Sequence, residues 1–215
     1  IDRKDAYVKR LVGMPGDTVE IDNSILKING KEFIPKKDAY VNFSYVVHTK
    51  TLLNPKVLYD DFSLIDRVDY GLIGRNDNEY IYSFSALTQE MVDQLKNNPS
   101  VTKIDQNISP KGKKDVKYYP DGRIDSTRTI FPLDKDWNHD NYGPLYIPKK
   151  GDQIKLTKEN ITQYYNIIKL FENHDLRVEG DKIFIDGKLT DEYTIEQDYF
   201  FMIGDNRHQS LDGRY

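Results

Sequence analysis

The sequence contains no cysteine among its 215 residues. This absence excludes disulfides, thiolate metal sites and cysteine nucleophiles together. No stretch approaches the roughly 18 consecutive apolar residues that a membrane-spanning helix needs, and no charged-then-apolar targeting sequence opens the chain. Because Ile1 is not a natural initiator, we expect the chain to begin within a longer protein, whose preceding segment could include a membrane anchor.

An excess of charge of one sign is also missing. The 31 basic and 35 acidic residues nearly cancel, so no broad basic face for nucleic acid is expected. The four histidines stand singly, without metal-ligand spacing or a matched acid, and a metal site or a histidine-based triad is not predicted. They are His48, His139, His174 and His208.

The two ends of the chain are rich in strand patterns. Residues 18–21 and 25–28 predict a hairpin, and residues 175–178 and 183–185 repeat its pattern. We therefore predict a mainly β fold, with an antiparallel sheet domain made of residues 1–36 and 146–215. A large mixed α/β domain, residues 37–145, is predicted to be inserted into it.

The predicted insert combines short strands, one short helix and a long polar segment. Strand-like runs occur at 45–47, 64–65 and 80–84, and a helix capped by Thr88 is expected over 88–97. Residues 103–141 predict a surface loop or lid, with a turn anchored by Trp137 near its end. A second helix, capped by Thr157, is expected over 158–172.

Candidate functional residues gather first near the carboxyl end. Residues 199–203 form an apolar and aromatic run, which predicts a strand buried on both faces. The run stops at Gly204-Asp205-Asn206-Arg207, and Ser210, Asp212 and Arg214 follow. Polar groups at the edge of a core are partly desolvated and need partners. Taken alone, however, the same residues favour an ordinary solvated turn.

A second candidate segment lies near the amino end. Residues 6–12 predict a strand that closes in a tight turn at Pro15-Gly16. Neighbours on a strand point to opposite faces, so either Lys9 or Arg10 must face a largely apolar layer. Burial lowers the pKa of a lysine; a fall from about 10.4 to between 7 and 8 takes about 4 kcal/mol and leaves a general base. The alternative is a lysine whose ammonium reaches water.

Both segments resemble signatures of the type I signal peptidases, serine proteases that use a Ser/Lys dyad. The carboxyl-terminal residues, from Gly204 to Arg214, resemble G-D-N-R-x-x-S-x-D-S-R, with Gly213 standing where the family has serine. The amino-terminal segment, from Tyr7 to Asp17, is similar to y-x-K-R-x-x-G-x-P-G-D and matches it throughout. The two segments also occur in the family's order.

The resemblance implies roles for particular residues. Lys9 would be the general base, and Ser210 would donate the hydrogen bond that orients its amine. Support of the site would come from two ion pairs and one further wall residue: Asp205 with Arg10, Asp212 with Arg214, and Arg207. No metal or organic cofactor is implied.

The nucleophile is the one element of the signature that is missing. In the family the attacking serine lies upstream of the lysine strand, whereas the first serine here, Ser24, follows Lys9 in a predicted loop. We therefore expect this polypeptide to carry half of a dyad and not to cleave peptides alone.

The resemblance also implies a substrate and a location. The full-length protein would cut signal peptides from secretory preproteins, after small residues at the first and third positions before the cleaved bond. It would sit in the bacterial cytoplasmic membrane through an amino-terminal anchor, with its catalytic domain on the extracytoplasmic side. The alternative is a non-catalytic β-rich binding module of the envelope. A cytosolic self-cleaving repressor is disfavoured, because such proteins lack the Gly204 to Arg214 pattern.

Overall fold

A computed structural model describes residues 7–36, 39–76, 78–125 and 128–215. The fold is mainly β, its ladders are antiparallel, and its helices are short, which confirms the predicted fold class. The chain forms two compact units. The first contains Ile1–Val8, Ile34–Ile108 and Gly204–Ser210, and the second contains Lys9–Phe33, Ser109–Ile203 and Leu211–Tyr215. The predicted insert thus overlaps both units, and its assignment as a separate domain stays a prediction.

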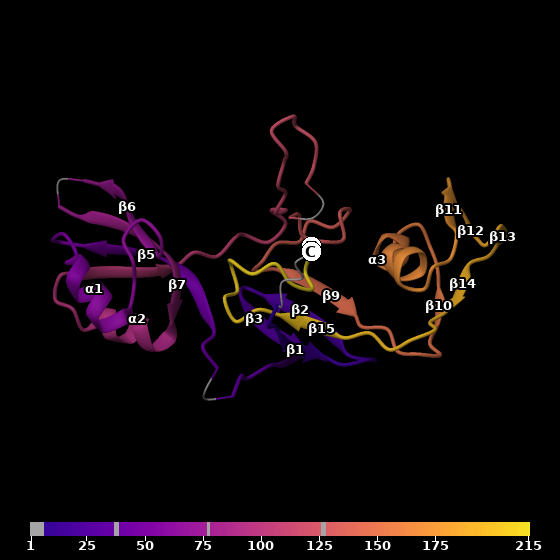
Figure 1. Cartoon of the computed structure of the whole chain (residues 1–215), viewed down its shortest axis with the longest axis horizontal. Coiled ribbons are helices and arrows are strands. Elements are labelled where there is room, and N and C mark those ends of the chain that lie inside the picture. Colours follow the sequence, from indigo (N-terminus) through magenta and orange to yellow (C-terminus); the bar gives the residue numbers. More distant parts are fainter. Residues whose placement is uncertain (1–6, 37–38, 77, 126–127) are drawn as a thin grey trace, which may run out of the picture. The chain divides into compact units, whose positions relative to one another are not determined.

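The first unit is a four-stranded sheet covered by two helices (Figure 1). The strands follow the order β6-β7-β5-β8: Tyr70–Arg75, Tyr80–Thr88, Asn42–Thr49 and Val101–Gln106. The helices are α1, Pro55–Phe62, and α2, Gln89–Lys96. Leu58 of α1 and Val92 and Leu95 of α2 join the buried side chains of the sheet in one apolar core. Both helices therefore pack on the sheet.

Local signals explain the two helices unequally. Helix α2 is the predicted one, and the Thr88 side chain accepts from the Met91 amide at its start. Helix α1 was not predicted, although Asn54 caps it and Pro55 opens it as helix-start chemistry prescribes. The strand expected at 64–65 is wrong, because the chain leaves α1 there through Ser63, which has a left-handed backbone.

The second unit contains four small sheets. Two of them share one apolar core: β1 with β15, and the order β4-β3-β2-β9. These strands are β1 Arg10–Gly13, β2 Thr18–Asp22, β3 Ile25–Ile28, β4 Lys31–Glu32, β9 Tyr142–Tyr146 and β15 Phe201–Ile203. The core includes Val12, Val19, Ile21, Tyr142 and Phe201.

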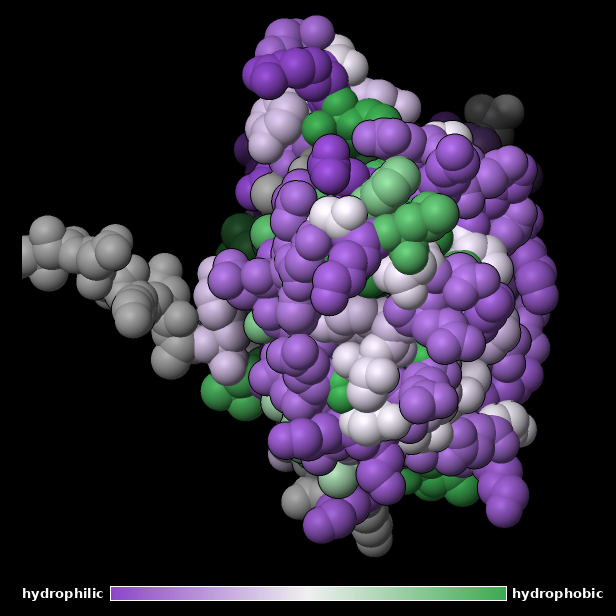
Figure 2. All heavy atoms as spheres, turned by 90° about the vertical axis from the view of Figure 1, so that its right-hand side faces the viewer, coloured by the Kyte–Doolittle hydropathy of each residue, from purple (hydrophilic) through white to green (hydrophobic). Residues whose placement is uncertain are grey.

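A second core of this unit joins most of the remaining strands to a helix. The strands are β10 Gln153–Lys155, β11 Leu176–Glu179, β12 Lys182–Ile185, β13 Lys188–Leu189 and β14 Glu192–Thr194. Helix α3, Ile161–Asn166, continues as a π-helix over Ile167–Phe171. The outward side of these elements is mostly hydrophilic, with only scattered apolar side chains (Figure 2).

The predicted start of this helix is wrong. We expected it to begin at residue 158 with Thr157 as its cap, but it begins at Ile161. The Asn160 side chain instead accepts from the Thr157 amide, which closes a turn before the helix. Ile161, Tyr164 and Ile168 are buried on the packed side of this helix, whereas Tyr165 and Phe171 are exposed.

The two similar hairpins are a repeat in three dimensions as well as in sequence. Strands β2, β3 and β4 pair in the same register as β11, β12 and β13, so that Val19↔Ile28 corresponds to Leu176↔Ile185, and Ile28↔Lys31 to Ile185↔Lys188. The turns also agree, since Asn29-Gly30 and Asp186-Gly187 all have left-handed backbones. Each copy supplies one side of a different core.

Within the described ranges, no helix has the length and apolar character needed to cross a membrane.

Candidate active site

The strand that follows Lys9 is shorter than predicted. We expected a strand from residue 6 through residue 12, but β1 begins at Arg10, and residues 7–9 have no regular structure. Arg10 pairs with Ile203, the last residue of β15, so the ladder ends there. The alternation argument therefore holds for Arg10 to Val12 and does not extend to Lys9.

The buried face of β1 is the one that carries Val12. Val12 is 6% exposed, whereas its neighbour Leu11 is 42% exposed, and Met202, paired with Leu11, is 45% exposed. Tyr7, two residues before Lys9, is 75% exposed. Lys9 itself is partly buried. The described residues thus place the apolar core on the Arg10 side of the strand.

The turn after β1 explains the remaining residues of the amino-terminal motif. The Asp17 carboxylate accepts from the Met14 amide at 2.8 Å and from the Asn29 side chain at 2.7 Å. Gly16 has a φ of 93°, which favours glycine. A side chain at Gly13 would lie 2.7 Å from a methyl group of Val19. Three motif residues are therefore required by the fold.

Strand β15, which precedes the second motif, pairs with the strand of the first motif. Its pairing with β1 is antiparallel, with Arg10 opposite Ile203 and Leu11 opposite Met202. The prediction that residues 199–203 are buried on both faces is wrong: Phe201 and Ile203 are buried, but Phe200 and Met202 are exposed. β15 pairs with β1 in a two-stranded sheet that has one face on the core, so its side chains alternate between buried and exposed.

The loop after β15 closes as a turn within the first unit. The Asn206 carbonyl accepts from the Ser210 amide, and its side chain accepts from the Gln209 amide, both at 3.1 Å. Arg207 and Ser210 are both buried. The Arg207 amide also donates to the Asn42 carbonyl at 3.0 Å. Two candidate site residues are thus fixed in a compact, hydrogen-bonded segment.

Asp212 and Arg214 form the ion pair that the resemblance implies. The Arg214 Nε and Nη2 atoms donate to the two carboxylate oxygens of Asp212, each at 2.8 Å. Both side chains have no exposed surface. The Arg214 carbonyl in turn accepts from the Phe131 amide at 2.7 Å. A bidentate pair of this kind is strong and directional, so it ties the end of the motif to the second unit's core.

Gly213 is the one position that departs from the family signature, and its surroundings give the reason. A Cβ atom there would lie 2.9 Å from the Met202 carbonyl oxygen and 3.1 Å from the Phe201 ring. The Gly213 amide also donates to that same carbonyl at 2.9 Å. In this chain the backbone at 213 lies too close to β15 for a side chain.

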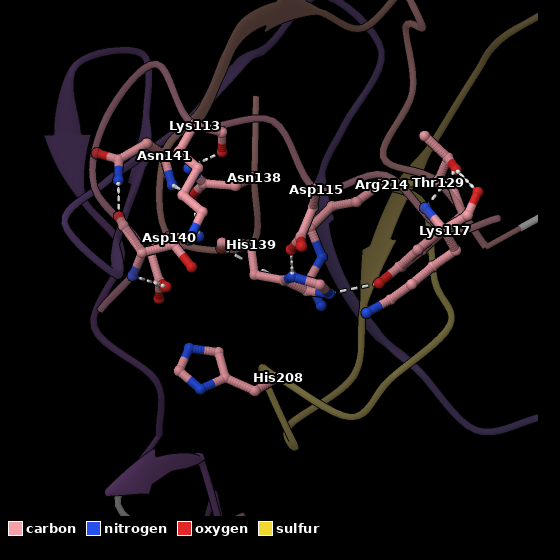
Figure 3. Close-up of polar contacts among 12 residues, drawn as sticks. Lys113, Asp115, Lys117, Thr129, Asn138, His139, Asp140, Asn141, His208 and Arg214 are labelled. Carbon is pink, nitrogen blue, oxygen red and sulfur yellow. Dashed lines mark hydrogen bonds and ion pairs between the residues drawn. The ribbon is translucent and has the colours of Figure 1, made fainter. Parts of the chain in front are cut away.

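A network that the sequence did not reveal lies beside this ion pair (Figure 3). The two ring nitrogens of His139 bond to the Asp115 carboxylate and to the Tyr215 hydroxyl, and its carbonyl accepts from Arg214. The hydrogen bond with His139 holds the pKa of Asp115 below its usual value. Burial raises the pKa of Tyr215 to about 12.

The expectation that the histidines lack matched acids is therefore wrong. His139 pairs with Asp115, His48 with Glu79, and His174 with both Asp186 and Glu196. These partners are distant in sequence, so residue spacing could not identify them. The nearest sequence signal was the polar segment around Trp137, which we predicted to be an anchored turn.

That segment is a buried turn. Trp137 packs on Tyr142 with ring centroids 4.8 Å apart. The Asn138 side chain donates to two carbonyls, those of Pro110 and Lys113, and accepts from the Asp140 and Asn141 amides (Figure 3). The Asp140 carboxylate accepts from the Ser24 hydroxyl at 2.5 Å. Ser24, in the turn between β2 and β3, therefore has Asp140 as a structural partner.

The remaining candidate residues divide between the two units. Lys9 and Arg10 belong to the second unit, whereas Asp205, Arg207 and Ser210 belong to the first. The pairing of Lys9 with Ser210, and of Arg10 with Asp205, stays a prediction.

Comparisons with known proteins agree on one family. The family model described as signal peptidase, peptidase S26, matches residues 1–71. A curated relative, signal peptidase I P of Bacillus subtilis subsp. natto, is 36% identical over 88 residues, which cover 40% of this chain and 44% of that protein. Signal peptidase I of Bacillus amyloliquefaciens is 36% identical over 74 residues, 34% of this chain and 32% of the relative.

A third relative, signal peptidase IB of Staphylococcus aureus, is 42% identical over 43 residues, 20% of this chain and 21% of that protein. The chain thus matches less than half the length of each of these relatives. No solved structure matches the chain. By the family model, the relatives and the two motifs together, the chain is similar to the type I signal peptidases.

Proposed function

We propose that this chain is the extracytoplasmic part of a type I signal peptidase, which removes signal peptides from secretory preproteins. The observation that carries the proposal is the pairing of the two motif strands, with Arg10 opposite Ile203. Arg10 and Ile203 form the terminal pair of this antiparallel ladder. Lys9, which precedes Arg10, and Gly204, which follows Ile203, therefore both adjoin the same end of the ladder. The family match over residues 1–71 supports the same assignment.

The proposed reaction is acyl transfer to a serine. A serine located upstream of Lys9 in the full-length protein attacks the scissile carbonyl carbon, and the neutral Lys9 amine takes the hydroxyl proton. The proton then passes to the leaving amine as the peptide bond breaks. Water hydrolyses the acyl-enzyme with Lys9 again as general base. Ser210 donates the hydrogen bond that orients Lys9, and Asp205 pairs with Arg10.

A neutral amine in this role needs an apolar surrounding and no adjacent carboxylate. The exposed side chains of Leu11 and Met202 offer an apolar surface beside β1 that the upstream segment would cover. We propose that this segment also holds the membrane anchor. Signal peptides with small residues before the cleaved bond are the proposed substrates.

The experiment measures signal-peptide cleavage by the full-length protein, by its Lys9→Ala and Lys31→Ala variants, and by the 215-residue chain. The full-length gene product should cleave a signal-peptide substrate, and Lys9→Ala should lower the rate by at least about a hundredfold, the usual contribution of a general base. Lys31→Ala, on an exposed strand end, is the control and should leave the rate unchanged. The 215-residue chain alone should be inactive.

Two results would overturn the proposal. Undiminished cleavage by the Lys9→Ala protein would remove the lysine from the mechanism. Cleavage by the 215-residue chain alone would show that no upstream serine is required for the reaction. A full-length protein that binds signal peptides without cutting them would favour the envelope binding module instead.

A further inference from the structure

We propose that Ser44 and His208 are positioning residues, which hold the loop from Asp205 to Ser210 against the start of β5. The resemblance assigns nothing to either residue: His208 occupies a variable position of its motif, and Ser44 lies outside both motifs. All the contacts that carry the inference lie within the first unit. Its consequence for catalysis rests on the proposed function, whereas the positioning itself does not.

The backbone of the loop is attached to β5 at Asn42. The Asn42 amide donates to the Asp205 carbonyl, and the Asn42 carbonyl accepts from the Arg207 amide, both at 3.0 Å. These two bonds make a parallel bridge between Asn42 and Asn206. A bridge at one residue fixes the position of the loop, and a second attachment to the same strand adds its orientation.

His208 supplies the second attachment. Its Nδ1 atom lies 3.1 Å from the Ser44 amide nitrogen and 2.6 Å from the Ser44 hydroxyl oxygen. The edge of its ring packs on Phe43, with centroids 5.7 Å apart. Because a backbone N–H can only donate, Nδ1 must accept, and the proton of the neutral ring must lie on Nε2. Ser44 is buried, so this bond is protected from competing water.

From this attachment the loop reaches Ser210 within two residues. The Asn206 side chain and carbonyl accept from the Gln209 and Ser210 amides, which closes the turn on the far side of His208. The anchoring residues begin β5, which is paired with β7 from Asn42 onward and with β8 from Tyr45 onward. The sheet of the first unit therefore sets the orientation of the segment that carries Ser210.

The test begins with the tautomer and with amide exchange in the 215-residue chain, neither of which requires activity. Nitrogen chemical shifts should show the His208 proton on Nε2 and a lone pair on Nδ1. His208→Leu should speed exchange of the Arg207 and Ser210 amides about tenfold, the effect of losing one buried hydrogen bond. His208→Asn should restore slow exchange, because asparagine Oδ1 takes the acceptor position of Nδ1.

A matched control is available in the same sheet. His48 also lies on β5 and makes a side-chain bond, to Glu79 at 3.0 Å, so His48→Leu should leave exchange of the loop unchanged. Ser44→Ala keeps the amide donor and removes only the hydroxyl, so its effect should be smaller than that of His208→Leu. A proton found on Nδ1, or no rescue by His208→Asn, would overturn the proposal. If His208→Leu fails to fold, the tautomer of His208 and amide exchange in His208→Asn and Ser44→Ala test the proposal instead.

The activity arm uses the full-length protein. His208→Leu should lower kcat by about a hundredfold with KM unchanged, as expected when a group in the site is displaced by about 1 Å, and His208→Asn should recover most of it. Lys9→Ala separates the two proposals. If that variant remains active while His208→Leu still frees the loop, the proposed function fails and the positioning stands; if exchange is unchanged, the positioning fails by itself.

Discussion

Removing the guanidinium of Arg214 should lower the free energy of unfolding far more than the loss of a similar ion pair at the surface would. The side chains of Arg214 and Asp212 have no exposed area, so Arg214→Met leaves a buried carboxylate without its counter-charge. Breaking one partner of a buried pair costs about 3–5 kcal/mol. Replacing both, as Asp212→Leu with Arg214→Met, should cost less than either single change, because no uncompensated charge remains.

The chain contains its own control for this prediction. Asp121-Gly122-Arg123 repeats the tripeptide Asp212-Gly213-Arg214 and forms the same ion pair at 2.8 Å, but its side chains are 52% and 77% exposed. Arg123→Met should therefore leave stability almost unchanged, since solvent screens an exposed pair.

Urea unfolding at pH 7, for the single and double variants of both pairs, gives the free energies of unfolding and their coupling. The reasoning is refuted if Arg214→Met costs no more than Arg123→Met. It is also refuted if the double variant at 212 and 214 costs the sum of its two single changes.

Two further predictions concern stability. Gly213→Ala should cost about 1–3 kcal/mol in urea unfolding, because its Cβ would lie 2.9 Å from the Met202 carbonyl oxygen, whereas Gly71→Ala, with no atom within 4 Å, should not show this steric cost. The Asp186 hydrogen bond, with help from Glu196 and against burial, raises the pKa of His174 above 6.5 in the folded state. Its stabilisation is therefore complete below about pH 6.5 and lost as pH rises through the folded-state pKa; unfolding midpoints between pH 5 and 9 should fall across that window, and His174→Gln should flatten the fall. An unchanged slope in that variant would assign the pH dependence to other groups.

Hairpins, turns and helix starts could be predicted from the sequence wherever neighbouring residues determine the backbone conformation. The hairpin at 18–28 and its repeat at 175–185 follow from alternation between turns, and α2 follows from its Thr88 cap. The turn at Pro15-Gly16 is equally local. Strand ends were less predictable: β1 starts at Arg10 because β15 stops at Ile203, and that limit is set by a partner nearly 200 residues away in the chain.

Side-chain partners could be predicted only where a motif supplied them. The Asp212 and Arg214 pair came from the resemblance, but no pattern links His139 to Asp115, 24 residues away, or to Tyr215, 76 residues away. Such pairs depend on how loops cross in space, and spacing along the chain carries no information about that. His208 was dismissed for the same reason, since its partner Ser44 is 164 residues distant.

The structure also separates two kinds of motif residue, and the separation decides which experiment is informative. Gly13, Gly16 and Asp17 serve the turn after β1, and Asp212 with Arg214 serves the core. A binding module that had lost its chemistry would still need every one of these residues to fold. Their presence therefore cannot distinguish a protease from such a module. Lys9 lies just before the first residue of β1, and the proposed function makes it the general base, so its replacement is the change that tests the protease against the module.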